Sequence, residues 1–265
     1  MNAGAGGVPR IHPTALIDSG ARLAPDVTVG PYSVIGPHVE VGTGTTIGSH
    51  AVITGHTRIG RNNTIFHFVS LGEAPQDKKY AGEPTQLEIG DGNTIREFCT
   101  FNTGTVQDAG VTRIGNDNWL MAYVHVAHDC QIGNHTIFAN NASLAGHVHV
   151  GDYAIFGGFS GAHQFCRIGA HSFLAKGTLV GQDVPPFFMV SGNPPAPYGV
   201  NSEGLKRRGF TAEDIAAIRV AYKTLYRAGL GLEDAKRALE AAAAGRPVLR
   251  TLLEFLASAS RGIVR

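Results

Sequence analysis

Apolar side chains recur at every sixth residue over most of this chain, and glycines and polar residues fill the positions between them. The period holds without a slip at Leu120, Val126, Ile132, Phe138, Leu144, Val150, Phe156, Ala162 and Ile168. A short fixed period is typical of a solenoid, whose repeats bury their apolar residues only against their neighbours. Because apolar helix positions recur at three and four residues, a period of six predicts short strands joined by tight corners.

The period begins at Ile11 and continues to Val180, with two interruptions. Polar segments near residues 73–86 and 102–112 break it, and we expect each to form a projecting loop of the kind that often carries function. Three repeats of six residues make one triangular coil of 18 residues. Residues 18 apart in sequence are therefore expected to stack on adjacent coils, at the roughly 4.8 Å spacing of paired strands.

Prolines mark the end of the repeat. Pro185 and Pro186 are expected to end the solenoid because proline cannot donate to a strand ladder. Residues 193–197 contain three more prolines and are expected to form a linker with little regular structure.

The remaining chain has the pattern of helices. Thr211 and Asp214 have the spacing of a capping box, an apolar helical stripe follows them, and two more helices are predicted over residues 233–244 and 248–259. The sequence thus predicts an all-β parallel β-helix over residues 11–190, then a linker and small C-terminal α-helical domain over 191–265. Residues 1–10 are expected to form a flexible tail.

Composition narrows the class of protein. With 43% hydrophobic and 16% charged residues the chain of 265 residues is globular, and a formal net charge of +1 argues against nucleic-acid binding. No apolar run reaches the roughly 18 residues of a membrane span, so no stable membrane insertion is expected. The start lacks the features of a signal peptide, and three cysteines without a paired motif predict reduced thiols. A cytoplasmic protein is therefore expected.

Steps of 18 residues gather scattered polar residues on one face of the solenoid. Gly146 and Gln164 follow His128 by 18 and 36 residues, and His147 follows Asp129 by 18. The side chains expected to converge beside His128 are His125, Asp129, His147, His163 and Gln164. This cluster is the candidate site.

A histidine held by a carboxylate stays in one tautomer and becomes a better base. Asp129 can hold His128 only at a corner of the coil, because adjacent side chains on a strand point to opposite faces. Such a base could take the proton of a substrate hydroxyl that attacks a thioester, worth about 10²–10⁴-fold in rate. The backbone N–H of Gly146 could stabilise the developing oxyanion, worth roughly 10²–10³-fold.

Two other interpretations fit part of the pattern. Several histidines on one face could bind zinc, as in β-helical hydratases of the carbonic-anhydrase type, although His125 and His128 do not have a strong ligand spacing. A non-catalytic β-solenoid scaffold would explain the repeat but not the polar stacking around His128.

Several segments together resemble the UDP-N-acetylglucosamine O-acyltransferases, a family of hexapeptide-repeat transferases. They are residues 76–85, 127–130, 140–142, 144–147, 163–166, 182–186, 199–201 and 203–210. The hexads alone occur in many acyltransferases, whereas the first segment, the His128-Asp129 pair and the Arg207-Arg208 segment are specific in combination. The resemblance implies a left-handed β-helix and a cytoplasmic homotrimer with active sites between subunits.

The resemblance also implies the reaction. An (R)-3-hydroxyacyl group would pass from acyl carrier protein to the 3-hydroxyl of UDP-N-acetylglucosamine, the first step of lipid A biosynthesis, although a 3-amino acceptor stays open. No metal is implied, and no cofactor beyond the phosphopantetheine of the carrier protein. His128 matches the general base, Asp129 its orienting carboxylate and Gly146 the oxyanion donor. Substrate contacts are implied for Gln76, Asp77, Lys79, His125, His147, His163, Gln164, Asn201, Glu203, Arg207 and Arg208.

Two positions depart from the family pattern. Residues 101–105 stand where many members carry a His-Arg-Gly-Thr segment. Lys176 occupies the position of the acyl-length ruler, where a glycine admits longer chains. We predict that Lys176 shortens the preferred acyl chain; the alternative is that its flexible stem turns aside. The carrier protein is expected to dock on basic residues near the helical domain, because carrier proteins are acidic.

Overall fold

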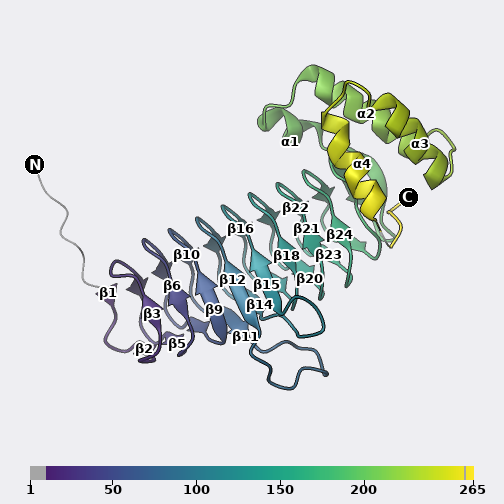
Figure 1. Ribbon diagram of the computed structural model, residues 1–265. Coiled ribbons are helices and arrows are strands. Elements are labelled where there is room, and N and C mark those ends of the chain that lie inside the picture. Colours follow the sequence, from purple (N-terminus) through teal and green to yellow (C-terminus); the bar gives the residue numbers. More distant parts are fainter. Residues whose placement is uncertain (1–9, 260) are drawn as a thin grey trace, which may run out of the picture.

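Three parallel sheets wind around one core to form a left-handed parallel β-helix, as the hexad period and the resemblance predicted (Figure 1). The computed structural model describes residues 10–259 and 261–265. The register pairs residues 18 apart, for example His125 with Ser143 and Ile137 with Ile155. Coil height is thus set by strand pairing.

The strands fall into three sheets, which we call A, B and C. Sheet A contains β1 (Arg10–Ile11), β4 (Thr28–Val29), β7 (Thr46–Ile47), β10 (Thr64–Ile65), β13 (Thr94–Ile95), β16 (Trp119–Leu120), β19 (Ile137–Phe138), β22 (Ile155–Phe156), β25 (Phe173–Leu174), β27 (Phe188–Ser191) and β28 (Ala196–Val200). Sheet B contains β2 (Leu16–Ile17), β5 (Val34–Ile35), β8 (Val52–Ile53), β11 (Ser70–Glu73), β14 (Thr100–Asn102), β17 (His125–Val126), β20 (Ser143–Leu144), β23 (Gly161–Ala162) and β26 (Leu179–Val180). Sheet C contains β3 (Arg22–Leu23), β6 (Glu40–Val41), β9 (His56–Ile59), β12 (Gln86–Ile89), β15 (Val111–Ile114), β18 (Gln131–Ile132), β21 (His149–Val150) and β24 (Arg167–Ile168).

The residues of the six-residue period line the interior. Phe138 and Phe156, both fully buried, stack with ring centroids 4.5 Å apart. Buried polar side chains complete the corners: the Asn63 side-chain oxygen accepts from the Asn93 backbone N–H, and the Asn93 oxygen accepts from the Asn118 N–H. These amides satisfy backbone donors where the chain turns between sheets.

Both predicted loops project from the edge between sheets B and C. One follows β11 and the other follows β14, and each returns to a sheet C strand (Figure 1). The Asn102 side-chain N–H donates to the Ala74 carbonyl over 2.9 Å, which ties the second loop to the first.

Two sequence expectations near the prolines are wrong. The sheet continues past Pro185 and Pro186, because these prolines lie in a corner and β27 then pairs in parallel with β25. The expected linker over 193–197 is partly strand, since β28 pairs antiparallel with β27. Prolines are tolerated in β28 because it is the edge strand of sheet A.

The N-terminal expectation is only partly testable. Arg10 belongs to β1 rather than to a tail, because it pairs with Thr28 of the next coil. The rest of the predicted tail, residues 1–9, lies outside the described residues.

Four helices follow among the described residues: α1 (Ser202–Arg207), α2 (Ala212–Tyr226), α3 (Leu232–Ala242) and α4 (Val248–Ser258). The capping box of Thr211 and Asp214 is present at the start of α2. Helix α1 was not predicted, since its six residues are too short for a helical period. In the described parts of the chain, no helix combines the length and apolar character that crossing a bilayer requires.

Candidate active site

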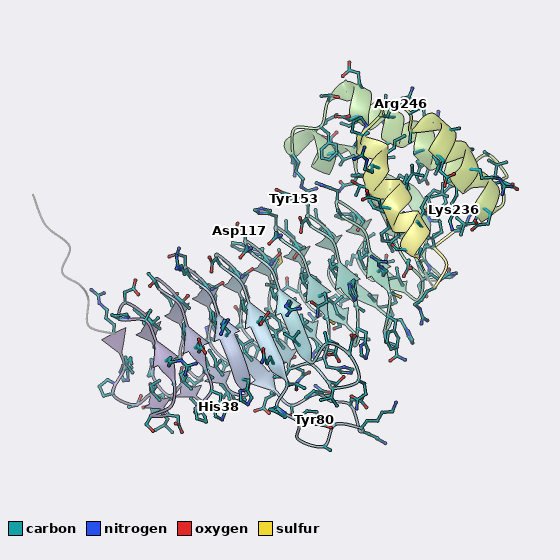
Figure 2. All side chains as sticks on the ribbon, in the orientation of Figure 1. His38, Tyr80, Asp117, Tyr153, Lys236 and Arg246 are labelled. Atoms are coloured by element: carbon teal, nitrogen blue, oxygen red, sulfur yellow. The ribbon has the colours of Figure 1, made fainter. Side chains whose placement is uncertain are left out.

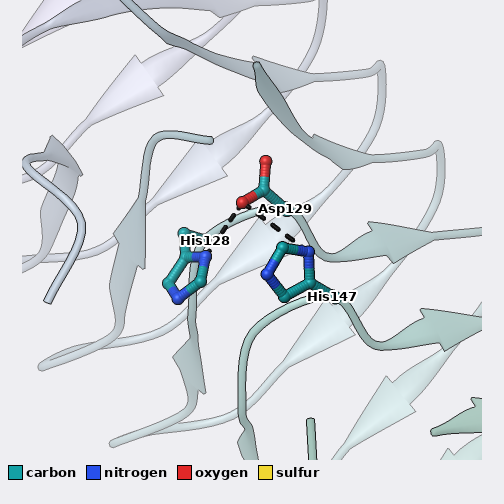
Figure 3. A group of neighbouring side chains, drawn as sticks. All are labelled: His128, Asp129 and His147. Atoms are coloured by element: carbon teal, nitrogen blue, oxygen red, sulfur yellow. Dashed lines mark hydrogen bonds and ion pairs between the residues drawn. The ribbon is translucent and has the colours of Figure 1, made fainter. Parts of the chain in front are cut away.

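His128 and Asp129 lie in the corner between β17 and β18, at the edge of sheets B and C. Asp129 has a positive φ of 60°, which breaks the strand alternation. Its Oδ2 consequently lies 2.9 Å from Nδ1 of His128 (Figure 3). The expected contact therefore forms, under the corner condition that the sequence set.

The Asp129 carboxylate is 1% exposed and has further donors. The Thr105 backbone N–H donates to Oδ1 over 2.8 Å, and the Thr105 hydroxyl donates to Oδ2 over 2.6 Å. Such donors favour the ionised carboxylate. Because an ionised carboxylate only accepts, His128 carries its proton on Nδ1 and leaves Nε2 with a lone pair.

Gly146 lies directly against the His128 ring, as the step of 18 predicted. A methyl group built on Gly146 would come within 2.5 Å of His128 Cε1 and 2.7 Å of its Nε2. Only glycine leaves room for the ring at this position.

His147 is held between both loops and the next coil. Its Nδ1 lies 2.7 Å from Asp108 Oδ2 and 3.8 Å from Asp129 Oδ2. Its ring stacks on Phe165 with centroids 4.4 Å apart and meets His128 edge-on. The hydrogen bond with His147 holds the pKa of Asp108 below its usual range.

A cleft of about 760 Å³ surrounds this cluster. It is lined by Gln76, Asp77, Lys78, Lys79, Gln107, Asp108, His128, His147, Gln164 and Phe165. Six of these residues were predicted from the sequence: Gln76, Asp77, Lys79, His128, His147 and Gln164. The cleft thus unites both loops with two corners of the solenoid.

Sequence reasoning missed three kinds of residue here. Phe165 follows His147 by 18, so the same arithmetic could have found it. Thr105 and Asp108 lie in the interrupted repeat, where no period gives their position. Cys130 adjoins Asp129, but burial raises its thiol pKa to about 12, so it is a poor nucleophile.

His125 and His163 lie near the cleft without lining it. His125 Nδ1 is 2.8 Å from the Thr100 hydroxyl, and burial lowers the pKa of His125. His163 precedes Gln164, and its Nδ1 lies 3.3 Å from the Gln164 carbonyl. Both belong to the B side of the same edge.

The residues expected around α1 lie elsewhere in the chain. The Asn201 side chain accepts from the Gly204 N–H at the start of α1 and donates to the His171 carbonyl. Arg208 lies 4.9 Å over the Tyr153 ring. Tyr153 and His171 occupy the edge between sheets C and A, far from the loop that carries Tyr80 (Figure 2).

The other expected residues are also apart from the cleft. Glu203 and Arg207 are exposed on α1, and Lys206 pairs with Glu203 over 2.8 Å. Lys176 is exposed at the third edge, between β25 of sheet A and β26 of sheet B. A single chain therefore does not bring all the predicted substrate residues together.

Comparisons with known proteins agree with this geometry. A family model described as UDP-N-acetylglucosamine O-acyltransferase, domain 2, matches residues 183–264, and the bacterial transferase hexapeptide model matches 9–43, 20–55 and 112–146. The acyl-[acyl-carrier-protein]–UDP-N-acetylglucosamine O-acyltransferase of Thiobacillus denitrificans is 69% identical over 255 residues, which cover 96% of this chain and 99% of that protein. Its counterpart in Janthinobacterium is 62% identical over 96% of this chain and 99% of its own length.

Solved structures show the same likeness. The UDP-N-acetylglucosamine acyltransferase of Francisella novicida has a TM-score of 0.94 and 44% identity, covering 96% of this chain and 94% of that one. The Arabidopsis enzyme has a TM-score of 0.84 and 36% identity, covering 96% and 100%. The zinc-hydratase and scaffold interpretations find no support among these relatives. The chain belongs to the UDP-N-acetylglucosamine O-acyltransferase family.

Proposed function

We propose that this acyltransferase moves an (R)-3-hydroxyacyl group from acyl carrier protein to the 3-hydroxyl of UDP-N-acetylglucosamine, with His128 as general base. The observation that carries the proposal is the His128–Asp129 pair, whose 2.9 Å contact leaves the second ring nitrogen free beside the cleft. The relatives' names supply the two substrates. The reaction would be the first step of lipid A biosynthesis, in the cytoplasm.

The reaction follows from the free nitrogen of His128. Nε2 takes the proton of the acceptor hydroxyl while its oxygen attacks the thioester carbonyl carbon. The tetrahedral oxyanion that forms lies close to the Gly146 backbone N–H. When the intermediate collapses, the C–S bond breaks and the phosphopantetheine sulfur takes the proton from His128. The products are the ester and the free thiol of the carrier protein.

The remaining cleft groups suit the sugar nucleotide. Lys78 and Lys79 give positive charge at one wall for the diphosphate, and the Asp77 carboxylate caps the Lys79 backbone N–H over 3.0 Å. Gln164 and His147 offer hydrogen bonds from the opposite wall. We therefore assign this cleft to the acceptor.

The donor atoms argue for acid–base rather than metal chemistry. His128, Asp129 and His147 could each offer one atom to a metal ion. Both Asp129 oxygens, however, already accept from Thr105, and Oδ2 also meets His128. A metal ligand at Asp129 would have to give up these bonds, so the proposed reaction uses no metal or resident cofactor.

We further propose a homotrimer, supported by the outward faces of the sheets. Sheet C carries paired charges such as Arg113 with Glu88. The outward faces of sheets A and B expose large apolar side chains, among them Leu16, Val34, Val52, Trp119 and Leu179. At the A–B edge, Tyr32, His50, Phe68, Phe98 and Tyr123 form a stacked column. Other copies of the chain would cover these apolar surfaces.

A trimer would also complete the site. The buried Nη1 of Arg208 has no hydrogen-bond partner among the described residues. We assign Asn201, Glu203, Arg207 and Arg208 of one subunit to the cleft of its neighbour, where they would contact the nucleotide or the phosphopantetheine arm. Mixing His128→Ala and Arg208→Ala chains in equal amounts, with subunit exchange, should restore about one quarter of the wild-type activity, since half of the subunits supply each intact half-site. No recovery in exchanged trimers would contradict this assignment.

The central test is acyl transfer by wild type, His128→Ala and the control His12→Ala, which replaces an exposed histidine of the first coil. We expect transfer to collapse only in His128→Ala and to be insensitive to a chelator. Activity retained by His128→Ala would refute the base assignment, and loss with the chelator would refute the metal-free reaction.

A further inference from the structure

The loop between β14 and β15 inserts a buried side chain beneath the His128–Asp129 pair. Thr105 is 0% exposed, although it belongs to an irregular loop. Both of its donors are directed at one carboxylate, which comes 24 residues later in the chain. The 2.6 Å hydroxyl contact is in the range of a charge-assisted hydrogen bond.

The path of this loop is closely determined. The Gly104 N–H donates to the Gln86 carbonyl, and the Gly110 N–H donates to the Thr105 carbonyl. A methyl group on Gly104 would lie 2.2 Å from the Val111 backbone nitrogen, so the chain passes there without room for a side chain. Thr105 is thus fixed by backbone contacts on both sides.

The same loop also controls His147. Nδ1 of His147 has Asp108 Oδ2 at 2.7 Å and Asp129 Oδ2 at 3.8 Å. Asp129 Oδ2 is the atom that His128 Nδ1 contacts (Figure 3). Because Asp108 satisfies His147, the Asp129 oxygen remains with His128 and Thr105. Without Asp108, the two histidines would compete for one oxygen.

We propose that Thr105 and Asp108 are positioning residues of the active site. Thr105 holds the Asp129 carboxylate under His128, and Asp108 keeps His147 from drawing that carboxylate away. Neither residue touches the reacting atoms. The proposal rests on His128 acting as the general base.

The test uses steady-state transfer kinetics of the full-length chain. Thr105→Val keeps the shape of the side chain but removes the hydroxyl, and Thr105→Ser restores it. We expect kcat to fall about 10- to 100-fold in Thr105→Val, as for loss of a hydrogen bond to a charged group. KM for the sugar nucleotide should stay within about 2-fold, and Thr105→Ser should recover most of kcat.

A second comparison asks whether Thr105 acts through Asp129. In an Asp129→Asn background, adding Thr105→Val should cost less than about 3-fold, because the ionised acceptor is already gone. For the other anchor, Asp108→Ala should lower kcat about 2- to 10-fold, and Asp108→Asn, whose side-chain oxygen still accepts, should be close to wild type.

The outcomes separate this proposal from the base assignment. An active wild type with an inactive His128→Ala supports the base. With that result, unchanged kcat in Thr105→Val, loss that serine does not restore, or full loss in the Asp129→Asn background overturns the positioning role of Thr105. If Thr105→Val does not fold, the half-exposed Asp108 position decides, and unchanged kcat in Asp108→Ala overturns the proposal.

Discussion

Replacing Gly146 with alanine should disable the base without unfolding the chain. The added methyl carbon would lie 2.5 Å from His128 Cε1, whereas carbon atoms pack best at about 3.5 Å. The ring must therefore retreat by about 1 Å. That movement would stretch or break the 2.9 Å contact with Asp129, since N–H···O bonds end near about 3.2 Å.

A shift of about 1 Å in a catalytic group can cost roughly 10²-fold in rate. We expect kcat of Gly146→Ala to fall by about that factor, while KM for the sugar nucleotide changes much less. Gly158→Ala is the matched control, because Gly158 occupies the equivalent corner two hexads later and its nearest neighbour would be 3.4 Å away. Transfer rates and thermal unfolding would be measured for both. If Gly146→Ala retained kcat within about 3-fold of wild type, the assignment of the His128 ring as base would be untenable.

Three other changes test separate parts of the structure. Burial lowers the pKa of His171 to about 4, so the folded chain binds fewer protons than the unfolded chain below about pH 6.5, and Tm should fall from pH 6.5 towards 4; His171→Phe should reduce that slope in scanning calorimetry, whereas no change would contradict it. Lys176→Gly should shift preference towards longer acyl chains in a competition among carrier-bound substrates, and an unchanged profile would show that its stem turns aside. Phe156→Ala should lower the free energy of unfolding by about 3–5 kcal/mol in denaturant titration, against little change for the 72% exposed Tyr198→Ala; a small loss would mean that the coil collapses onto the cavity.

The repeat made much of the fold predictable, because each hexad repeats one physical requirement. A residue such as Phe138 must be apolar, and strand pairing then sets its neighbour 18 residues later. Where other contacts govern, the sequence pattern was misleading. Pro186 looked like an end, yet it lies in a corner whose strand ladder resumes at β27. The prolines of 193–197 looked like a linker, yet an edge strand tolerates missing donors.

The site divided in the same way. Gly146, His147 and Gln164 were predictable beside His128 because the coil length converts sequence steps into contacts. Thr105 was not, because its loop leaves the repeat and returns along a path that only the folded backbone defines.

The two insertions explain why a regular solenoid can hold an acid–base site. A corner of the repeat presents one side chain per coil at positive φ, as at Asp129, His147 and Phe165. That column stacks groups accurately but offers no second layer of polar partners, since strands above and below have the same spacing. The loop after β14 supplies the missing donors to Asp129, and the loop after β11 supplies charge at the cleft. Precision therefore comes from the repeat, and the electrostatic environment of the base comes from the places where the repeat is broken.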